Sequence, residues 1–138
     1  MRKKLIFLFL LLVCTNCFAL DEYNYWLNMW NKYNTPSDNG SLTSQAALNL
    51  GFYYQSKGSY DNAIIWFNRA GDKYKLINGN RAAVPAHIAD TYILKGNCSQ
   101  KTFDLYSEAI GNVIDSPPYI IEELQQKAYN AMEYCHKI

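Results

Sequence analysis

The sequence predicts an all-α protein of about six helices stacked around a shared core, and three observations lead to that prediction. Beyond residue 19, apolar side chains recur every three or four residues, which is the period of an α-helix. Short segments rich in Gly, Pro, Asn and Ser separate these stretches. A pattern of a large aliphatic residue, a small residue, Tyr and Gly occurs twice, at residues 50–58 and 88–96.

Residues 1–19 have the character of an export signal. Basic residues 2–4 precede an unbroken apolar run over residues 5–13, and the small residue Ala19 ends the segment. This order is typical of a secretory signal peptide cut after Ala19. The run is too short to favour a permanent membrane anchor. We therefore expect an exported protein, either periplasmic or secreted, whose folded domain spans residues 20–138.

A bacterial lipoprotein is an alternative interpretation, because Cys14 and Cys17 follow the apolar run. Val13 and Asn16 precede them, where lipoprotein signals have Gly, Ala or Ser, so the sequence favours cleavage without lipidation. Cleavage would remove three of the 13 basic residues and none of the 12 acidic ones, leaving a net charge of −2. Without a basic stripe, nucleic acid and anionic membranes are poor partners.

Each predicted helix has its own signal. Residues 21–34 are predicted to form a helix with an aromatic face and an opposite face rich in Asn. We expect the aromatic face to cover the next hairpin. Membrane binding is disfavoured because the polar face carries a single cation, Lys32. A polar loop over residues 35–41 leads to helices predicted at about 42–57 and 60–75. Two further helices follow the break at residues 78–80, and Ser116 is expected to cap a last helix that starts with Pro117 and Pro118.

The first hairpin resembles a tetratricopeptide repeat. The resemblance rests on a motif shared between its two helices: Ala47-x2-Leu50-Gly51-x2-Tyr54, then Gly58, Tyr60, Ala63-x3-Phe67 and Ala70. In this family, small residues lie where two helices cross and large ones fill the space around them. A second copy matches at offsets of 38 and 39 residues, and its longer turn after Gly96 resembles the related Sel-like repeats. The resemblance implies a short right-handed α-solenoid of two hairpins, closed at both ends by capping helices.

The same resemblance makes a prediction about Cys98 and Cys135. In the implied architecture, the turn that holds Cys98 and the end of the last helix lie at the same edge of the stack, so the two can meet. An even number of Cys in an exported domain favours a disulfide. A metal site using His136 is the rival interpretation, but it lacks further ligands at a recognisable spacing. We expect a disulfide, no metal and no cofactor.

The resemblance also implies a binding surface, since such proteins hold ligands in the concave face formed by the first helix of each repeat. The corresponding positions are Gln45, Leu48, Phe52 and Gln55 in the first copy, and Ala86, Asp90, Ile93 and Leu94 in the second. The mixed apolar and polar character of this surface favours a helix or an extended segment of another protein. The alternative is that Phe52, Ile93 and Leu94 pack against a capping helix.

We expect a protein–protein interaction module acting as an adaptor or scaffold, and not an enzyme. The sequence has no Gly-flanked nucleophilic Ser, no phosphate-binding glycine loop and no paired metal motif. His87 is interpreted as a packed helix residue, and Asp90 and Asp104 as solvated charges. A small exported hydrolase or inhibitor on the same disulfide-linked scaffold remains the alternative, and a deep pocket with convergent polar groups would favour it.

Overall fold

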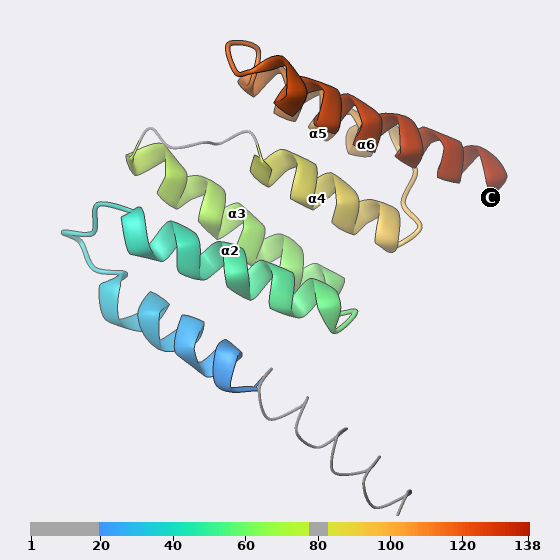
Figure 1. Ribbon diagram of the computed structural model, residues 1–138. Helices are drawn as coiled ribbons and strands as arrows, with labels where there is room; N and C mark the ends of the chain where they lie inside the picture. Colours follow the sequence, from blue (N-terminus) through green and yellow to red (C-terminus); the bar gives the residue numbers. More distant parts are fainter. Residues whose placement is uncertain (1–19, 78–82) are drawn as a thin grey trace, which may run out of the picture.

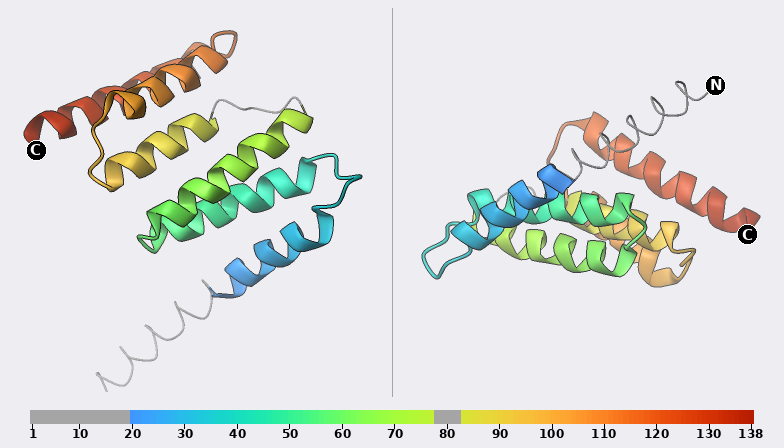
Figure 2. Two further views of the ribbon diagram at one scale, coloured as in Figure 1. Left: turned by 180° about the vertical axis from the view of Figure 1, so that it is seen from behind. Right: turned by 90° about the horizontal axis from the view of Figure 1, so that it is seen from below.

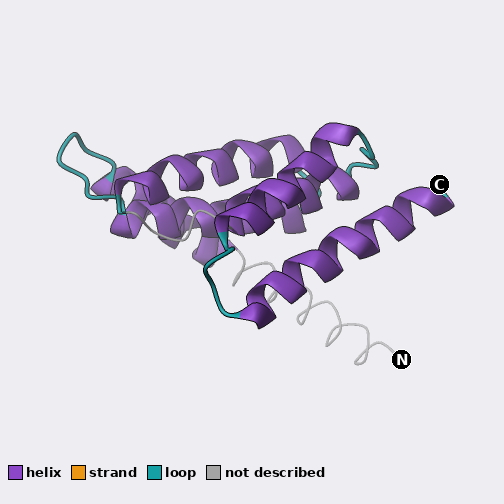
Figure 3. Cartoon of the chain, turned by 90° about the horizontal axis from the view of Figure 1, so that it is seen from above, coloured by secondary structure: helices purple, strands orange, loops and turns teal. Residues whose placement is uncertain are grey.

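The computed structural model describes residues 20–77 and 83–138, which form helices and loops (Figure 3). The expected signal peptide and the break predicted at residues 78–80 lie outside these ranges. Six helices occupy the described part of the chain: an N-terminal helix over residues 20–33, α2 (Ser41–Ser56), α3 (Tyr60–Leu76), α4 (Ala83–Leu94), α5 (Gln100–Asn112) and α6 (Pro118–Lys137). The predicted all-α class is confirmed.

Each helix packs mainly against its neighbours in sequence (Figure 1). The N-terminal helix lies at one end of the array and α6 at the other, with α2, α3 and α4 between them (Figures 1 and 2). None of the helices within the described ranges combines the length and apolar character that crossing a bilayer requires.

Helices α2 and α3 cross closely at Gly51. A Cβ atom added at Gly51 would lie 2.5 Å from two ring carbons of Phe67, so only glycine allows the two helices to approach this far. Phe67 and Leu50 are fully buried at this crossing, together with Ala63 and Ala70. The turn between the helices contains Gly58 at φ 73°, a left-handed conformation that glycine adopts without strain.

The N-terminal helix docks on this hairpin through its aromatic face, as the sequence predicts. The Trp30 ring packs edge-on against Trp66 of α3, with ring centroids 5.2 Å apart. The Tyr23 and Tyr54 hydroxyls lie 3.2 Å apart, which ties the helix to α2. The aromatic residues at this end of the molecule therefore build the core and an edge of the stack.

A buried carboxylate fixes the loop before α2. Asp38, whose side chain is only 5% exposed, forms a 3.0 Å ion pair with Lys73 of α3. It accepts hydrogen bonds from the Gly40 backbone N–H at 2.9 Å and from the Thr43 hydroxyl at 2.5 Å. Burial favours the neutral acid, but the hydrogen bonds from Thr43 and Gly40, together with Lys73, outweigh it and lower the pKa of Asp38.

Helix α4 connects two clusters of buried side chains. Val84 and Ile88 pack into the cluster formed with α2 and α3, whereas Ala86 and Ala89 pack into a second cluster with α5 and α6. Because consecutive positions on α4 serve different clusters, this helix is apolar around most of its circumference. It therefore fixes the distance between the two halves of the molecule.

Helix α6 closes the array, and its start differs from the sequence prediction. Pro117 occupies the N-cap position and Pro118 begins the helix, so the expected cap by Ser116 is wrong. Pro fits here because the first helical residue needs no backbone N–H. Cys135, near the other end of α6, forms the expected disulfide with Cys98 in the α4–α5 turn, with Cα atoms 5.8 Å apart. In the chain-entropy account, a loop of this length stabilises the fold by about 3–4 kcal/mol.

Candidate functional site

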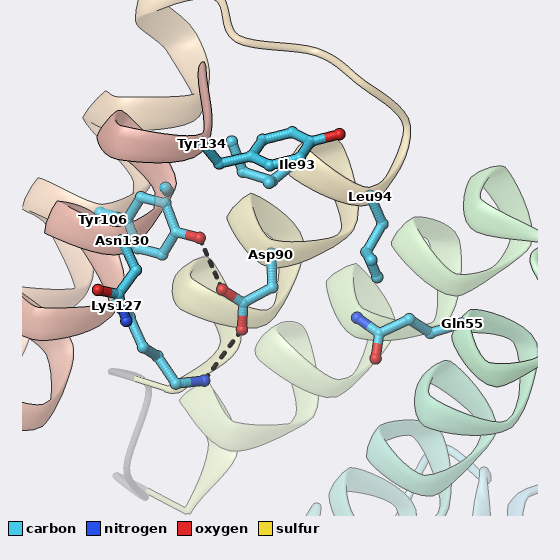
Figure 4. A pocket seen from close by; sticks show the side chains of 9 residues that line it. Gln55, Asp90, Ile93, Leu94, Tyr106, Lys127, Asn130 and Tyr134 are labelled. Carbon is cyan, nitrogen blue, oxygen red and sulfur yellow. Dashed lines mark hydrogen bonds and ion pairs between the residues drawn. The ribbon is translucent and has the colours of Figure 1, made fainter. Parts of the chain in front are cut away.

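A pocket of about 580 Å³ lies between α2, α4, α5 and α6 (Figure 4). Its lining side chains come from segments far apart in the sequence: Gln55, Asp90, Ile93, Leu94, Tyr106, Lys127, Asn130, Ala131 and Tyr134. Four of these residues belong to α6, so the position of that helix defines the pocket.

Asp90 occupies the centre of the pocket, and both of its oxygens are engaged (Figure 4). The Tyr106 hydroxyl donates a hydrogen bond of 2.6 Å to one oxygen, and the Lys127 ammonium donates one of 3.0 Å to the other. The interpretation of Asp90 as a solvated surface charge is therefore wrong, since its side chain is 28% exposed and paired. Sequence spacing alone could not show that α5 and α6 bring partners to it.

The walls of the pocket are apolar, and two carboxamides flank them. Ile93 of α4 and Tyr134 of α6 face each other, and Leu94 stands between them and Gln55 (Figure 4). Ala131 of α6 also lines the pocket. Leu94 is 54% exposed, so a ligand could cover it. Among the described residues, no group bonds the side-chain carbonyl of Gln55 or the side-chain N–H groups of Asn130. A carbonyl acceptor on Gln55 and the N–H donors of Asn130 therefore remain at the rim.

A short hydrogen-bonded chain orients Gln55. Its amide nitrogen donates to the Thr91 hydroxyl at 3.0 Å, and that hydroxyl donates to the His87 backbone carbonyl at 2.7 Å. Thr91 is fully buried, so the arrangement is held in a dry environment. The free oxygen of Gln55 therefore has a defined position and not a mobile one.

His87 lies behind the pocket, between two aromatic rings. Its ring stacks on Phe67 at 5.5 Å and meets the edge of Phe52 at 4.7 Å. Burial lowers its pKa and the nearby charge of Lys127 lowers it further, while Asp90 opposes both effects. His87 is therefore neutral at pH 7 and packs as an aromatic residue, in agreement with the sequence interpretation.

The structure brings half of the predicted binding residues together. Gln55, Asp90, Ile93 and Leu94 line the pocket. The other four lie elsewhere: Gln45 is exposed outside the pocket, Leu48 packs on the first core cluster, Ala86 is buried in the second, and Phe52 contacts His87 and Phe67. Phe52 also lines a separate pocket of about 200 Å³ with Trp26 of the N-terminal helix.

Sequence reasoning missed the contribution of α5 and α6. Lys127, Asn130 and Tyr134 follow one another at helical spacing, so a signal for a shared face was present. Lys127 also lies 37 residues after Asp90, close to the 38-residue offset between the two matching sequence motifs. The sequence interpretation assigned α6 only the role of an end cap, whereas one face of this helix lines the pocket.

The titratable side chains of the pocket are paired with one another. Burial raises the pKa of Tyr106, and its hydrogen bond to Asp90 raises it further, so the phenol keeps its proton. Asp90 is occupied on both oxygens and is not a free base. Within residues 20–77 and 83–138, no cluster of three or more His, Cys, Asp or Glu residues is arranged to hold a metal ion.

Comparisons with protein-family models, with curated proteins and with solved structures give no match to this chain.

Proposed function

We propose that this protein is an exported interaction module whose pocket between α2, α4, α5 and α6 binds an extended, apolar segment of another protein. The observation that carries the proposal is the composition of the pocket: apolar walls, a charge-paired floor, and two carboxamides at the rim that each keep hydrogen-bonding capacity. Such a site accepts an apolar side chain and hydrogen-bonds the backbone that carries it.

The fold that we propose for this role is a short right-handed α-solenoid of two tetratricopeptide-like or Sel-like hairpins, α2–α3 and α4–α5, between capping helices. The close approach at Gly51 and the pairing of consecutive helices support it. In such an array the first helices of successive hairpins share one face. Gln55 on α2, Asp90 on α4 and Lys127 on α6 all line one pocket, which is consistent with that arrangement.

The paired floor argues for an uncharged ligand segment. Asp90 and Lys127 neutralise each other at 3.0 Å, so neither presents a lone charge to an incoming group. A charged side chain would lose its hydration without gaining a free partner, whereas an aliphatic or aromatic one would gain from covering Leu94 and Tyr134. We therefore expect a preference for apolar side chains over Lys, Arg, Asp or Glu at the central position of the segment.

Export to an oxidising compartment is part of the proposal. The disulfide between Cys98 and Cys135 supports it, because such bonds persist mainly in the periplasm or outside the cell. The proposed signal peptide supplies the route.

A small hydrolase is the second candidate, and one observation favours it: Asp90, Tyr106 and Lys127 converge in a single pocket. We rank it below binding because the Tyr106 phenol and the Asp90 carboxylate are bonded to each other. If the pocket were an active site, Asp90→Asn would abolish a hydrolytic activity of the purified protein while leaving partner capture unchanged.

Site-specific photocrosslinking tests the proposed function. A photoreactive phenylalanine analogue is placed at Leu94 or Tyr134, which line the pocket, and at Ile114, a 73% exposed control outside it. We expect Leu94 and Tyr134 to crosslink one and the same apolar segment of a partner from the source cells, identified by mass spectrometry. Equal labelling from Ile114, or no common segment at the two pocket positions, would contradict the proposal.

A further inference from the structure

The pocket depends on α6, but few noncovalent contacts hold the C-terminal half of that helix. Leu124 and Ala131 are the buried residues of α6, and beyond Ala131 only Cys135 is even half-buried. Tyr134, which forms one wall, is 47% exposed. The ion pair between Lys127 and Asp90 is itself partly open to water, and such pairs contribute little stability.

The strongest link at this end of α6 is covalent. The bond between Cys98 and Cys135 joins the last turns of α6 to the α4–α5 turn, four residues beyond Leu94. The disulfide therefore joins two segments that line the pocket. Leu94 lies four residues before Cys98, and Tyr134 directly precedes Cys135. Without the bond, the packing of this half of α6 would rest mainly on two alanines, the buried Ala131 and the half-buried Ala128.

We propose that the Cys98–Cys135 disulfide is a redox gate on the pocket: reduction releases the C-terminal half of α6 and dismantles the wall formed by Asn130 and Tyr134. That this gate controls partner binding rests on the function proposed above. The gate itself, a local release of one helix, does not.

The chemistry requires a dithiol reductant, such as a thioredoxin-like protein or dithiothreitol. Its thiolate attacks one sulfur of the bond, forming a mixed disulfide and releasing the other Cys as a thiolate, which takes up a proton. The second thiol of the reductant then displaces the remaining Cys. Two electrons and two protons pass to the protein, and the reductant leaves as a disulfide. Cys98 and Cys135 are both half-buried and not enclosed, so a reductant can reach them.

Release is expected to stay local because the rest of the fold has its own core. The N-terminal helix, α2 and α3 share a cluster of buried side chains that contains no residue of α6. The N-terminal half of α6 keeps Leu124, which packs in the second cluster with Tyr106 and Val113. Helix α6 should therefore open from its C-terminus while the hairpins remain folded.

Amide hydrogen exchange followed by mass spectrometry tests the gate. The purified oxidised protein is compared with the same protein in dithiothreitol and with a Cys98→Ser/Cys135→Ser variant. We expect exchange over residues 127–137 to become at least about tenfold faster on reduction and in the variant, with α2 and α3 unchanged. In the variant, dithiothreitol should have no further effect, which separates the reductant's action on this bond from any other.

Two results would overturn the gate. One is unchanged exchange over residues 127–137 after reduction. The other is loss of protection in α2 and α3 as well, which would show that the disulfide stabilises the whole fold and not α6 alone. Both results can be obtained even if the Cys98→Ser/Cys135→Ser variant fails to fold, because reduction is applied to wild-type protein that has already folded. If α6 is released but reduction leaves photocrosslinking from Leu94 unchanged, the gate stands and the proposed function of the pocket fails.

Discussion

Replacing Gly51 by alanine should destabilise the protein, although alanine is normally the better helix former. A Cβ at this position would lie 2.5 Å from Cδ1 and Cε1 of Phe67 and 3.0 Å from Cγ. Phe67 is fully buried, and Phe52 and His87 contact its ring with centroids 5.2 and 5.5 Å away. The ring therefore has little room to retreat, and α2 and α3 must move apart.

The magnitude follows from two opposing effects. Overpacking of a close-packed core costs about 1–3 kcal/mol. The higher helix propensity of alanine returns about 0.5–1 kcal/mol. Overpacking should win, so we expect a net loss of about 0.5–2 kcal/mol in the free energy of unfolding, measured by urea denaturation followed by far-UV circular dichroism.

Gly111→Ala is the matched control, because this helical glycine of α5 has no atom within 4 Å of the added Cβ. It should be neutral or slightly stabilising. Combining Gly51→Ala with Phe67→Leu should cost less than the sum of the two single changes, since the smaller side chain relieves the overlap. If Gly51→Ala behaves like Gly111→Ala, the described crossing of α2 and α3 is incorrect.

Two further predictions concern buried polar groups. Asp38→Asn should lower the free energy of unfolding by about 2 kcal/mol at pH 7, because Lys73 loses its charged partner. The pKa of Asp38 is lowered in the folded state, so its contribution is complete above the ordinary value of 3.8 and lost as the pH falls through the folded pKa. Urea denaturation should therefore show the difference between wild type and variant shrinking as the pH is lowered below 3.8. Tyr106→Phe should cost about 1 kcal/mol at pH 7. Because the pKa of Tyr106 is raised, the folded state binds the phenolic proton more tightly than the unfolded state does, and the stabilisation holds below pH 10 and is lost as the pH rises further. In urea denaturation at alkaline pH, the variant should therefore lose less stability than wild type. Equal losses would contradict the hydrogen bond between Tyr106 and Asp90.

The sequence predicts the helical class well because each helix carries a local signal. The apolar spacing and turn residues place α2 and α3 within one or two residues of their bounds. Gly51, Ala63 and Phe67 belong to a motif in which small residues allow two helices to cross closely and a large residue fills the space beside them. The order of helices that the resemblance implies also predicts the pairing of Cys98 with Cys135, because it places the α4–α5 turn and the end of the last helix at the same edge.

The site is predicted less well because it depends on contacts between distant helices. Asp90 has no partner within its own helix, so only the packing of α5 and α6 reveals that Tyr106 and Lys127 bind it. Ala86 is buried in the second core cluster, whereas Phe52 packs against Phe67 and His87 outside the pocket and stays 37% exposed. Helical periodicity places both residues on a face of their helix, but it does not show which neighbouring helix covers that face.

The most direct measurement of the central claim is the affinity of the protein for the segment that photocrosslinking identifies. A synthetic peptide of that segment is titrated calorimetrically into wild type, Leu94→Asp and Ile114→Asp, each first shown to be folded. If the pocket is the binding site, Leu94→Asp should weaken binding by at least about tenfold, since a charge replaces an apolar contact on the wall, and Ile114→Asp should match wild type. Equal affinity in all three proteins would contradict the claim that the pocket between α2, α4, α5 and α6 is where this protein acts.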